Sequence, residues 1–462
     1  MKRILPKKAR RLLRGGLLLA AIYLLGCLLV PPAVGTQRKS AARVSRPAPA
    51  AESVCLIDSN EDALAWRLRL IGSAQEQILL STFDFRADSS GSDVLAALLD
   101  AADRGVEVCV LVDGMNAQLH LQGSAAFAAL GAHENTSVKF YNPLRLTGLW
   151  RANYRCHDKY LIIDGGAYLI GGRNTSDLFL GPGGRARQNM DRDVLVHSGP
   201  GGSVETLLEY FDDIWALDTN RAFRPRAEKK RVREAAAALQ ERWTALQNAA
   251  SVPIDWEAET LPAAGVSVLH GDCRARNKEP ALLNTLGDLM AQGRESIVLQ
   301  TPYIICNRAM YDTLEKAASG TAQVQILTNA PQSGANPWGC ADYLNHKGRI
   351  LATGAAVCEW SGQRSMHTKT ILVDARTCLI GSFNWDMRSA YLDTEMMLLV
   401  DSPALNAALR ADTEALLRQG RTLTPEGTVL PGADYFPPEE PFLKKLLQPV
   451  LRAVICPFRY LL

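Results

Sequence analysis

The sequence predicts an α/β protein made of two copies of one domain behind an N-terminal transmembrane helix. Three observations predict it. Strand-like and helix-like segments alternate in the same order in both halves, one short polar motif occurs once in each half, and an uncharged run follows a basic start. Alternating strands and helices are typical of a sheet covered by helices. A length of 462 residues is sufficient for two such domains.

Composition narrows the class of protein further. Hydrophobic residues make up 47% of the chain and charged residues 21%, which excludes a disordered protein. The net charge is +3, and seven basic residues without an acid lie in the first fourteen positions. Since these seven exceed the net charge, the remaining residues carry about −4. Proteins that bind nucleic-acid phosphates are usually basic, so no nucleic-acid partner is expected.

The first element is the uncharged run GGLLLAAIYLLGCLLV at residues 15–30, which we expect to end at Pro31 and Pro32. Together with the basic start it predicts a single-pass membrane anchor over residues 1–35. A lipoprotein signal around Cys27 and a cleaved signal peptide are the alternatives. Basic residues favour the cytoplasmic side, so the start is expected inside a bacterial cell and the rest of the chain outside.

Five segments are predicted after the anchor. They are a Pro-, Ala-, Ser- and Arg-rich linker (36–52), the first domain (53–225), a helical connector (226–250), the second domain (251–420) and a C-terminal tail (421–462). The end of the tail, Phe442–Leu462, has four basic residues, no acid and many apolar side chains. This pattern predicts an amphipathic segment on an anionic bilayer, with packing against the protein body as the alternative.

Each half shows the same order of strands and helices. In each, two apolar runs flank a helical stretch: Ile78–Phe85, Asp93–Arg104 and Val106–Asp113, then Ile297–Ile304, Ala309–Ala318 and Val324–Asn329. Two short β-rich runs follow in each: Tyr160–Asp164 with Tyr168–Ile170, and Thr370–Asp374 with Cys378–Ile380. The ten cysteines show no metal-binding spacing, and disulfide pairing stays open.

The repeated polar motif lies at the same place in both halves. The first copy reads His157-Asp158-Lys159, then Asp164, then Gly171-Gly172-Arg173-Asn174. The second reads His367-Thr368-Lys369, then Asp374, then Gly381-Ser382-Phe383-Asn384, with identical offsets throughout. Residues two apart on a strand point to the same face, so the His and Lys of each copy are expected to project together.

This double motif resembles the phospholipase D superfamily, over about residues 55–420. The run from Asn384 to Ser389 and the pair Thr394-Glu395 are similar to the bacterial cardiolipin synthase-like branch. The resemblance implies two phospholipase D-like α/β sandwich domains, each with a mixed central sheet flanked by helices, that share one active site. One departure is Gly172, which stands where the common pattern has the serine that Ser382 keeps.

The resemblance also implies roles for these residues. His157, Lys159, Asp164, His367, Lys369 and Asp374 form the catalytic set, although the two aspartates are expected to be mainly structural. Asn174, Asn384 and Ser382 are expected to bind substrate, and Glu395 and Asp193 to orient the histidines. His157 is expected to be the nucleophile and His367 the acid and base, although the near-symmetric pair itself leaves this choice open. Trp150, Tyr154 and Trp338 are candidates for a lipid entrance or for packing.

We therefore expect a phosphatidyltransferase that works through a phosphohistidine. Its predicted reaction converts two phosphatidylglycerol molecules into cardiolipin and glycerol at a phospholipid bilayer. No metal or cofactor is expected because the lysines supply the positive charge, and no obligate protein partner is evident. Alternatives are a hydrolase using water, of phospholipase D or nuclease type, and a lipid-binding protein without activity. The acceptor and the oligomeric state stay open.

Overall fold

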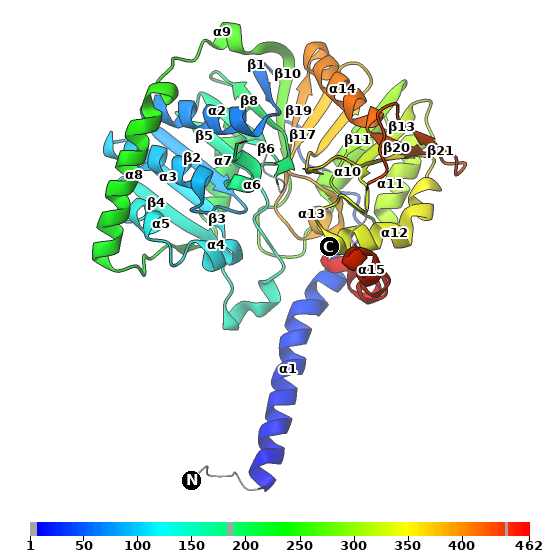
Figure 1. The fold of residues 1–462 in the computed structure, drawn as a ribbon, viewed down its shortest axis with the longest axis horizontal. Coiled ribbons are helices and arrows are strands. Elements are labelled where there is room, and N and C mark those ends of the chain that lie inside the picture. Colours follow the sequence, from blue (N-terminus) through cyan, green and yellow to red (C-terminus); the bar gives the residue numbers. More distant parts are fainter. Residues whose placement is uncertain (1–6, 183–187, 439–441) are drawn as a thin grey trace.

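The computed structural model describes residues 7–182, 188–438 and 442–462. Part of the predicted basic start (1–6) and of the predicted tail (439–441) therefore lies outside the described residues. Figure 1 shows two α/β halves side by side, with helix α1 (Lys7–Gly35) projecting away from them. The predicted fold class, a duplicated mixed sheet flanked by helices, is confirmed.

Seventeen strands of the described chain form one continuous sheet. The first half contributes β1 (Ala50–Ile57), β2 (Gln77–Thr82), β3 (Glu107–Asp113), β4 (Thr136–Tyr141), β5 (Tyr160–Ile163), β6 (Ala167–Gly171), β8 (Asp193–His197) and β9 (Arg221–Ala222). The second contributes β10 (Leu261–His270), β11 (Ser296–Gln300), β13 (Gln323–Asn329), β14 (Ala356–Trp360), β16 (Thr370–Val373), β17 (Thr377–Gly381), β19 (Met396–Asp401), β20 (Gly420–Leu423) and β21 (Val429–Pro431).

Strand pairing makes the two halves equivalent. From the outer edge inward, the first half runs β9, β4, β3, β2, β5, β6, β8, β1. The second half runs β20, β14, β13, β11, β16, β17, β19, β10, with β21 added at its edge. Antiparallel pairing of β1 with β10 joins the halves at the centre. Both halves place the strand after each His-Lys pair, β5 or β16, at the same position.

Helices cover both faces of the sheet. Those of the first half are α2 (Asn60–Ser73), α3 (Ser89–Asp103), α4 (Gly114–His120), α5 (Ala125–Leu130), η1 (Leu146–Arg151), α6 (Asp177–Leu180), α7 (Val204–Trp215) and α8 (Lys229–Ala250). Those that follow are α9 (Trp256–Glu259), α10 (Ala281–Met290), α11 (Arg308–Ala318), α12 (Pro337–Leu351), α13 (Met387–Tyr391), α14 (Pro403–Arg418), α15 (Phe442–Ile455) and η2 (Cys456–Leu461).

Two large apolar cores stabilise this arrangement. One lies in the first half, where α2, α3, α5 and α8 cover one sheet face. The other spans both halves, because side chains of α7 pack together with those of β10 and of the second half's strands and helices. Burial of apolar surface is the main stabilising contribution to folding. The shared core therefore holds the two copies in a fixed relation, which an active site built from both requires.

Helix α1 extends beyond the prolines that were expected to end its uncharged run. It continues through Pro31 and Pro32 to Gly35, although a proline lacks the N–H that a helix interior needs. The last turn is kept because the Pro32 carbonyl accepts hydrogen bonds from the N–H and the hydroxyl of Thr36. The part Arg14–Gly35 is long and apolar enough to cross a bilayer, by length and composition.

The predicted linker and tail are both attached to the second half. In the linker, the Val44 N–H donates to Thr285 Oγ1 at 3.0 Å, and Arg43 pairs with Asp288. Strand β20 begins at Gly420 and pairs with β14, so the sheet continues past the predicted end of the second domain. At the other end of the tail, α15 packs against α12 and lies near the base of α1 (Figure 1).

Candidate active site

The two histidines are positioned by short strand contacts that cross between the halves. Cys156 forms a parallel bridge with Thr394, and the His157 N–H donates to Thr394 Oγ1 at 3.1 Å. Correspondingly, β15 (Ser365–Met366) pairs with β7 (Asn189–Met190), and the His367 N–H donates to the Met190 carbonyl at 2.7 Å. The backbone of His157 is therefore held next to Glu395, and that of His367 next to Asp191. Each acid belongs to the opposite half.

His157 contacts Glu395 of the second half. Its Nδ1 lies 2.9 Å from Glu395 Oε1, and the ring of Phe83 meets it edge-on at 5.0 Å. Glu395 in turn accepts hydrogen bonds from the hydroxyls of Ser389, at 2.6 Å, and Ser382. A proton on Nδ1 directed at Glu395 leaves Nε2 with its lone pair free. The geometry therefore presents His157 as a base or nucleophile.

His367 contacts Asp191 of the first half. Its Nδ1 lies 2.6 Å from Asp191 Oδ2 and 2.7 Å from Lys369 Nζ, and Phe179 meets its ring edge-on at 5.0 Å. Nδ1 either donates to Asp191 or accepts from Lys369, so both neutral tautomers fit. The two histidine sites thus follow one plan, with an aromatic edge on one side and a carboxylate from the opposite half on Nδ1.

The two motif lysines are buried beside their histidines. Lys159 Nζ donates to the His157 carbonyl, and Lys369 Nζ donates to the His367 carbonyl. Burial lowers the pKa of both lysines, that of Lys369 to about 7. Two ammonium groups in a water-poor site provide strong stabilisation for an anionic group such as a phosphate.

The carboxyl groups of Glu395 and Asp191 differ in pKa. Burial raises the pKa of Glu395 to about 8, against the opposing effect of Lys159. Burial acts the same way on Asp191, but the charges of Lys369 and His367 outweigh it and bring its pKa to about 2. Burial and Lys369 lower the pKa of His367 to about 4, and burial lowers that of His157 as well. At neutral pH, Asp191 is therefore ionised, whereas Glu395 binds a proton more readily.

The motif asparagines are buried with unused hydrogen-bonding capacity. Asn174 and Asn384 occupy equivalent positions after β6 and β17, and neither amide oxygen has a partner among the described residues. The Asn384 N–H donates to Ser389 Oγ at 3.2 Å, which fixes its backbone. Since buried polar groups usually have partners, these amides are candidates for contacts with a bound ligand.

Ser382 is placed differently from its predicted substrate-binding role. Its hydroxyl donates to Glu395 and accepts from the Met396 N–H at 3.1 Å, so it supports the carboxylate behind His157. The equivalent Gly172 has a matching explanation. A Cβ added there would lie 2.7 Å from Asp191 Oδ2 and closer still to Oδ1. The shorter acid Asp191 lies against the backbone where a serine would otherwise be.

The motif aspartates lie outside the site. Asp164 and Asp374 end strands β5 and β16 with positive φ angles of 50° and 48°. Asp164 accepts hydrogen bonds from the N–H groups of residues 75–77, and Asp374 from those of residues 294–296. Five residues of strand separate each from its lysine by about 16 Å. Their inclusion in the catalytic set is therefore corrected to a structural role, in line with the reservation stated for them.

The histidine-orienting acid of the first half is Asp191 rather than the predicted Asp193. Asp193 is buried against two arginines, Arg67 at 3.0 Å and Arg173 at 3.4 Å. Pairing of Gly171 with Asp193 and of Gly381 with Met397 makes Asp191 the equivalent of Glu395. Spacing obscures this, because Asp191 follows Asn174 by 17 positions and Glu395 follows Asn384 by 11. In the sequence, only the glycine at position 172 indicated that another side chain lies close to the backbone there.

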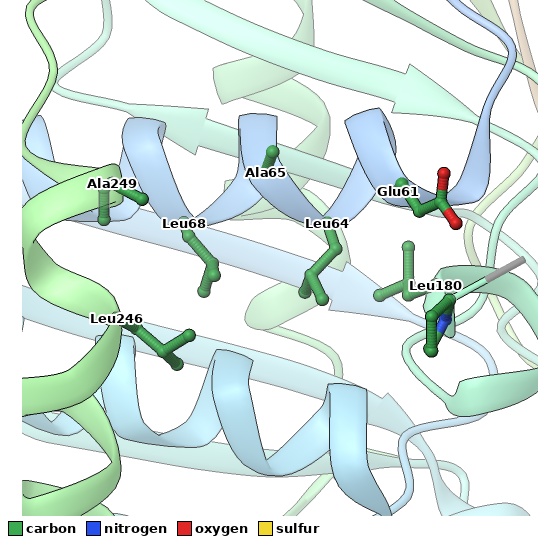
Figure 2. A pocket seen from close by; sticks show the side chains of 9 residues that line it. Glu61, Leu64, Ala65, Leu68, Leu180, Leu246 and Ala249 are labelled. Atoms are coloured by element: carbon green, nitrogen blue, oxygen red, sulfur yellow. The ribbon is translucent and has the colours of Figure 1, made fainter.

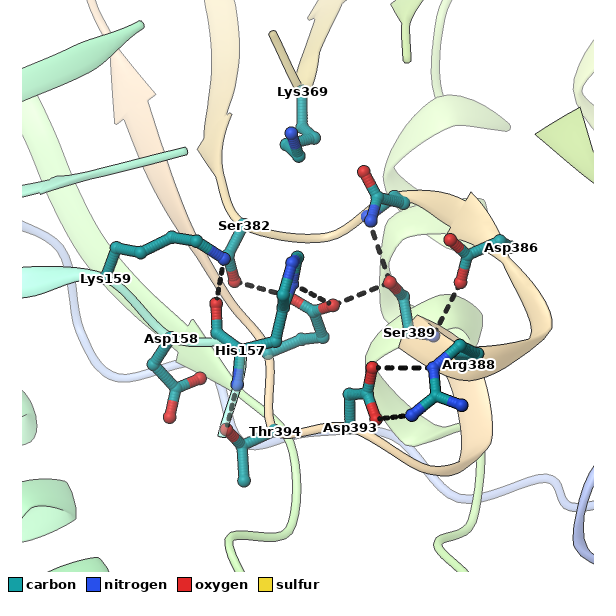
Figure 3. A network of polar contacts seen from close by, with 12 residues as sticks. His157, Asp158, Lys159, Lys369, Ser382, Asp386, Arg388, Ser389, Asp393 and Thr394 are labelled. Carbon is teal, nitrogen blue, oxygen red and sulfur yellow. Dashed lines mark hydrogen bonds and ion pairs between the residues drawn. The ribbon is translucent and has the colours of Figure 1, made fainter. Parts of the chain in front are cut away.

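Other contacts were not predicted from the sequence. Phe83 and Phe179 carry no motif, and only the fold brings them against the histidines. Asp386 caps α13 by accepting from the Ser389 N–H at 2.7 Å, which positions the Ser389 hydroxyl on Glu395 (Figure 3). In the described part of the chain, no group of three His, Cys, Asp or Glu side chains is arranged to hold a metal ion.

Two pockets are relevant to ligand entry, one at the site and one on the surface of the first half. One of about 200 Å³ contains His367 and is lined by Asn189, Tyr303 and Asn336 among others. The other, of about 230 Å³, is apolar and lies between α2, α6 and α8, where Leu64, Leu68, Leu180 and Leu246 face one another (Figure 2). Among the entrance candidates, Trp150 and Trp338 are partly exposed, whereas Tyr154 is packed and its hydroxyl donates to Asn277 Oδ1 at 2.9 Å.

Comparisons with known proteins agree with this arrangement. A family model described as "Cardiolipin synthase, PLD-like domain" matches residues 68–215 and 286–417. Cardiolipin synthase C of Escherichia coli K12 is 26% identical over 399 residues, which cover 76% of this chain and 81% of that protein. An uncharacterized protein of Helicobacter pylori J99 is 25% identical over 403 residues, 78% of each chain.

A solved structure is similar in fold. The crystal structure of phosphatidylserine synthase from Haemophilus influenzae has a TM-score of 0.61 and 18% identity, covering 89% of this chain and 95% of that one. At this identity the likeness concerns the fold. It extends over both halves, as a duplicated architecture requires.

Proposed function

This chain belongs to the family described as cardiolipin synthase, PLD-like domain, and on that premise we propose that it is a phospholipid phosphatidyltransferase. The observation that carries the proposal is the pair of buried histidines, each fixed through Nδ1 by a carboxylate of the opposite half. Two such imidazoles are what a two-step transfer through a covalent intermediate needs, because one attacks and the other moves protons.

In the first step, His157 Nε2 attacks the phosphorus of phosphatidylglycerol. The bond from phosphorus to the glycerol headgroup oxygen breaks as the new N–P bond forms, and His367 donates a proton to the departing oxygen. The anionic phosphate raises the pKa of a neighbouring imidazole when it binds, which supplies His367 with that proton. The product is a phosphatidyl-histidine and free glycerol.

In the second step, the hydroxyl of a second phosphatidylglycerol attacks the phosphorus. Its proton passes to His367, the N–P bond to His157 breaks, and cardiolipin is released. Lys159 and Lys369 are suited to neutralise the non-bridging oxygens, and Asn174 and Asn384 to hydrogen-bond them. These four side chains belong to both motif copies, so one phosphate contacts both halves of the chain.

The carboxylates support the division of roles between the histidines. Asp191, the firmer anion, favours a proton on His367, as an acid and base requires. Glu395 accepts hydrogen bonds from two serine hydroxyls and lies against Nδ1 of His157 without a competing lysine, which keeps the ring proton on Nδ1 and Nε2 free to attack. This difference favours His157 as the nucleophile.

The choice of a lipid substrate is supported by the relatives and by helix α1. Cardiolipin synthase C of Escherichia coli, by its name, makes cardiolipin, and the apolar stretch Arg14–Gly35 suits a protein that works at a bilayer. We further propose that α1 anchors the chain in the bacterial cell membrane with both halves outside the cytoplasm, because the basic residues precede the span.

The test is to incubate the purified full-length protein with phosphatidylglycerol vesicles, alone and with phosphatidylethanolamine, and to analyse the products. Cardiolipin plus glycerol supports the proposal. Phosphatidic acid alone indicates that water is the acceptor, and cleavage of labelled DNA without lipid turnover indicates a nuclease. Vesicle binding without any product indicates a lipid-binding protein without activity.

The matched variants are His157→Ala and His367→Ala, with His133→Ala as the control. His133 is a surface residue that pairs with Asp103 at 3.2 Å, away from both motifs. We expect each motif variant to lose turnover and the control to keep it. Retention of full activity in either motif variant would refute the mechanism.

A further inference from the structure

Helix α15 presents its apolar side to the outside of the molecule. Phe442, Leu446 and Val450 are 79%, 60% and 57% exposed, and Leu447 and Val454 are exposed beside them. Residues four apart lie on one face of a helix, so these side chains form a continuous apolar strip.

Other residues of the same helix contact the protein, where Ile455 is buried. Lys444 Nζ donates to the Gln332 carbonyl at 2.9 Å, and Arg452 Nε donates to Asn345 Oδ1 of α12 at 2.8 Å. A helix on the surface of a soluble protein usually exposes polar side chains and keeps its apolar strip on the core. The exposed apolar strip of α15 is therefore suited to an apolar partner outside the chain.

A second apolar projection lies beside helix α1. In η1, Leu146 is 83% exposed and Trp150 is also exposed. The segment η1 itself packs beside α1. The contact is specific, since Asn153 Nδ2 donates to the Leu28 carbonyl at 2.7 Å. In a regular helix that carbonyl would accept from residue 32, but Pro32 has no N–H. Asn153 thus supplies the missing donor and fixes η1 against α1.

The position of this contact along α1 indicates that the outside partner of the apolar side chains is the bilayer surface. Leu28 precedes the end of the helix at Gly35 by seven residues, or about 10 Å along the axis. If α1 crosses a bilayer, η1 lies at the depth that interfacial side chains reach. The other end of the chain converges on the same place, because η2 packs against α1.

We propose that α15, η1 and the adjoining turns of α1 form one docking face for the surface of the bilayer that α1 spans. The docking face consists of Leu146 and Trp150 of η1 and Phe442, Leu446, Leu447, Val450 and Val454 of α15. Residues 442–462 contain four basic residues and no acid, and Lys445 is exposed, so the face suits anionic lipids.

The docking face borders the pocket that contains His367. Lys444 holds the loop at Gln332, directly before Ala335 and Asn336, which line this pocket. Resting on the proposed function, the inference is that a phospholipid enters from the membrane surface beside α15 without crossing water. This access differs from the anchoring by α1, which fixes the chain to the bilayer but does not by itself give a lipid a route to the site.

The first test measures depth without using activity. A tryptophan is introduced by Val450→Trp, and by Leu430→Trp as the control on β21, which is equally exposed but outside the docking face. The full-length proteins are reconstituted in phosphatidylglycerol and phosphatidylethanolamine vesicles with brominated acyl chains. We expect the added emission at position 450 to fall by about half and that at position 430 to stay unchanged. Equal quenching at both positions, or none at either, overturns the proposal.

The second test measures access. The double variant Leu446→Glu/Val450→Glu is compared with Leu430→Glu on vesicle phosphatidylglycerol and on a short-chain phosphatidylglycerol dissolved as monomers. We expect the double variant to lose about tenfold in rate on vesicles and to keep its rate on monomers, since burying charge in the interface is unfavourable. An unchanged vesicle rate, or equal loss on both substrates, contradicts the access route. If the wild type turns over neither substrate, the proposed function fails, and the quenching result alone decides whether the face docks.

Discussion

Gly172 and Ser382 occupy the same position in the two motif copies, and each matches the acid beside it. Ser382 donates to the longer Glu395, whereas Gly172 leaves space for the shorter Asp191. The distance from each acid to its histidine is nearly the same, 2.9 and 2.6 Å. Residue size at one position is therefore coupled to the identity of the catalytic acid at another.

This coupling predicts the effect of one methyl group. Gly172→Ala must displace the Asp191 carboxylate from His367, and we expect kcat to fall by about a hundredfold with little change in KM. The control is Gly166→Ala on the same hairpin, where an added Cβ meets no atom closer than 3.9 Å. Steady-state kinetics of both variants checks this. Equal activity of the two would show that Asp191 tolerates displacement.

The pH dependence should report Lys369. Its pKa is lowered to about 7 by burial, so the ammonium is present below that pH and is lost as the pH rises through it. We expect kcat/KM to fall above about pH 7 as the charge that stabilises the phosphate disappears. Lys369→Arg keeps a cation at every pH and should remove this decline, even where the overall rate is lower. Persistence of the same decline in Lys369→Arg would assign it to another group.

For single residues, the sequence predicted those that repeat in both copies. It did not predict which residues contact each other across the two halves. The histidines, lysines and asparagines were predictable because their offsets match between the copies. Asp191 was not, since six extra residues shift it and the neighbouring Asp193 has the same charge. Which acid meets which histidine depends on pairing across the halves, and no spacing within one copy contains that information.

Among the elements, the entry to β8 adds a buried polar connection between the halves. Arg192 is fully buried, and its guanidinium contacts Asp58 at 2.6 Å, Gln300 and Thr370 at 3.0 Å, and Asp412. Its backbone N–H donates to Asp191 Oδ1 at 2.8 Å. One residue therefore joins two acids, two strands and the carboxylate behind His367.

Removing this guanidinium should destabilise the protein strongly. Arg192→Met leaves the buried Gln300 and Thr370 without their donor, whereas the paired acids are 39% and 35% exposed and keep contact with water. We expect the free energy of unfolding to fall by about 2–4 kcal/mol. Arg376→Met, which breaks an exposed pair with Asp401 on β19, should cost no more than about 1 kcal/mol. Denaturant unfolding of both variants provides the comparison. Similar small losses would mean that the Arg192 network contributes little.

The predicted elements were largely correct where hydrophobic periodicity is strong. The predicted helix Asp93–Arg104 corresponds to α3, which begins earlier, at Ser89, because the Asp88 side chain caps it by accepting from the Gly91 N–H. The helix of the anchor continues past the prolines that were expected to end its uncharged run, because a neighbouring segment supplies the donor that Pro32 lacks. Both deviations arise from side-chain contacts, which periodicity does not contain.

For the whole molecule, the crossed contacts predict that loss of each acid impairs a different histidine. Glu395→Gln should slow formation of the phosphatidyl-histidine at His157 by about a hundredfold or more, whereas Asp191→Asn should slow both formation and breakdown, because His367 moves a proton in each step. A phosphatidyl ester whose leaving group needs no proton, such as a nitrophenol, bypasses the proton transfer of the first step. Trapping with such an ester, labelled in its phosphate, should show little labelled protein in the Glu395 variant and accumulation in the Asp191 variant. The reverse pattern would exchange the roles of the histidines.

The central pairing of β1 with β10 has a consequence for how such a site can change in evolution. If the same sheet were assembled from two identical chains, any substitution would appear in both histidine environments at once. Covalent linkage removes that constraint. A serine can become a glycine and a glutamate an aspartate in one copy alone, so donor and acceptor chemistry can be adjusted independently. The two copies differ in this way, since one carries Gly172 with Asp191 and the other carries Ser382 with Glu395.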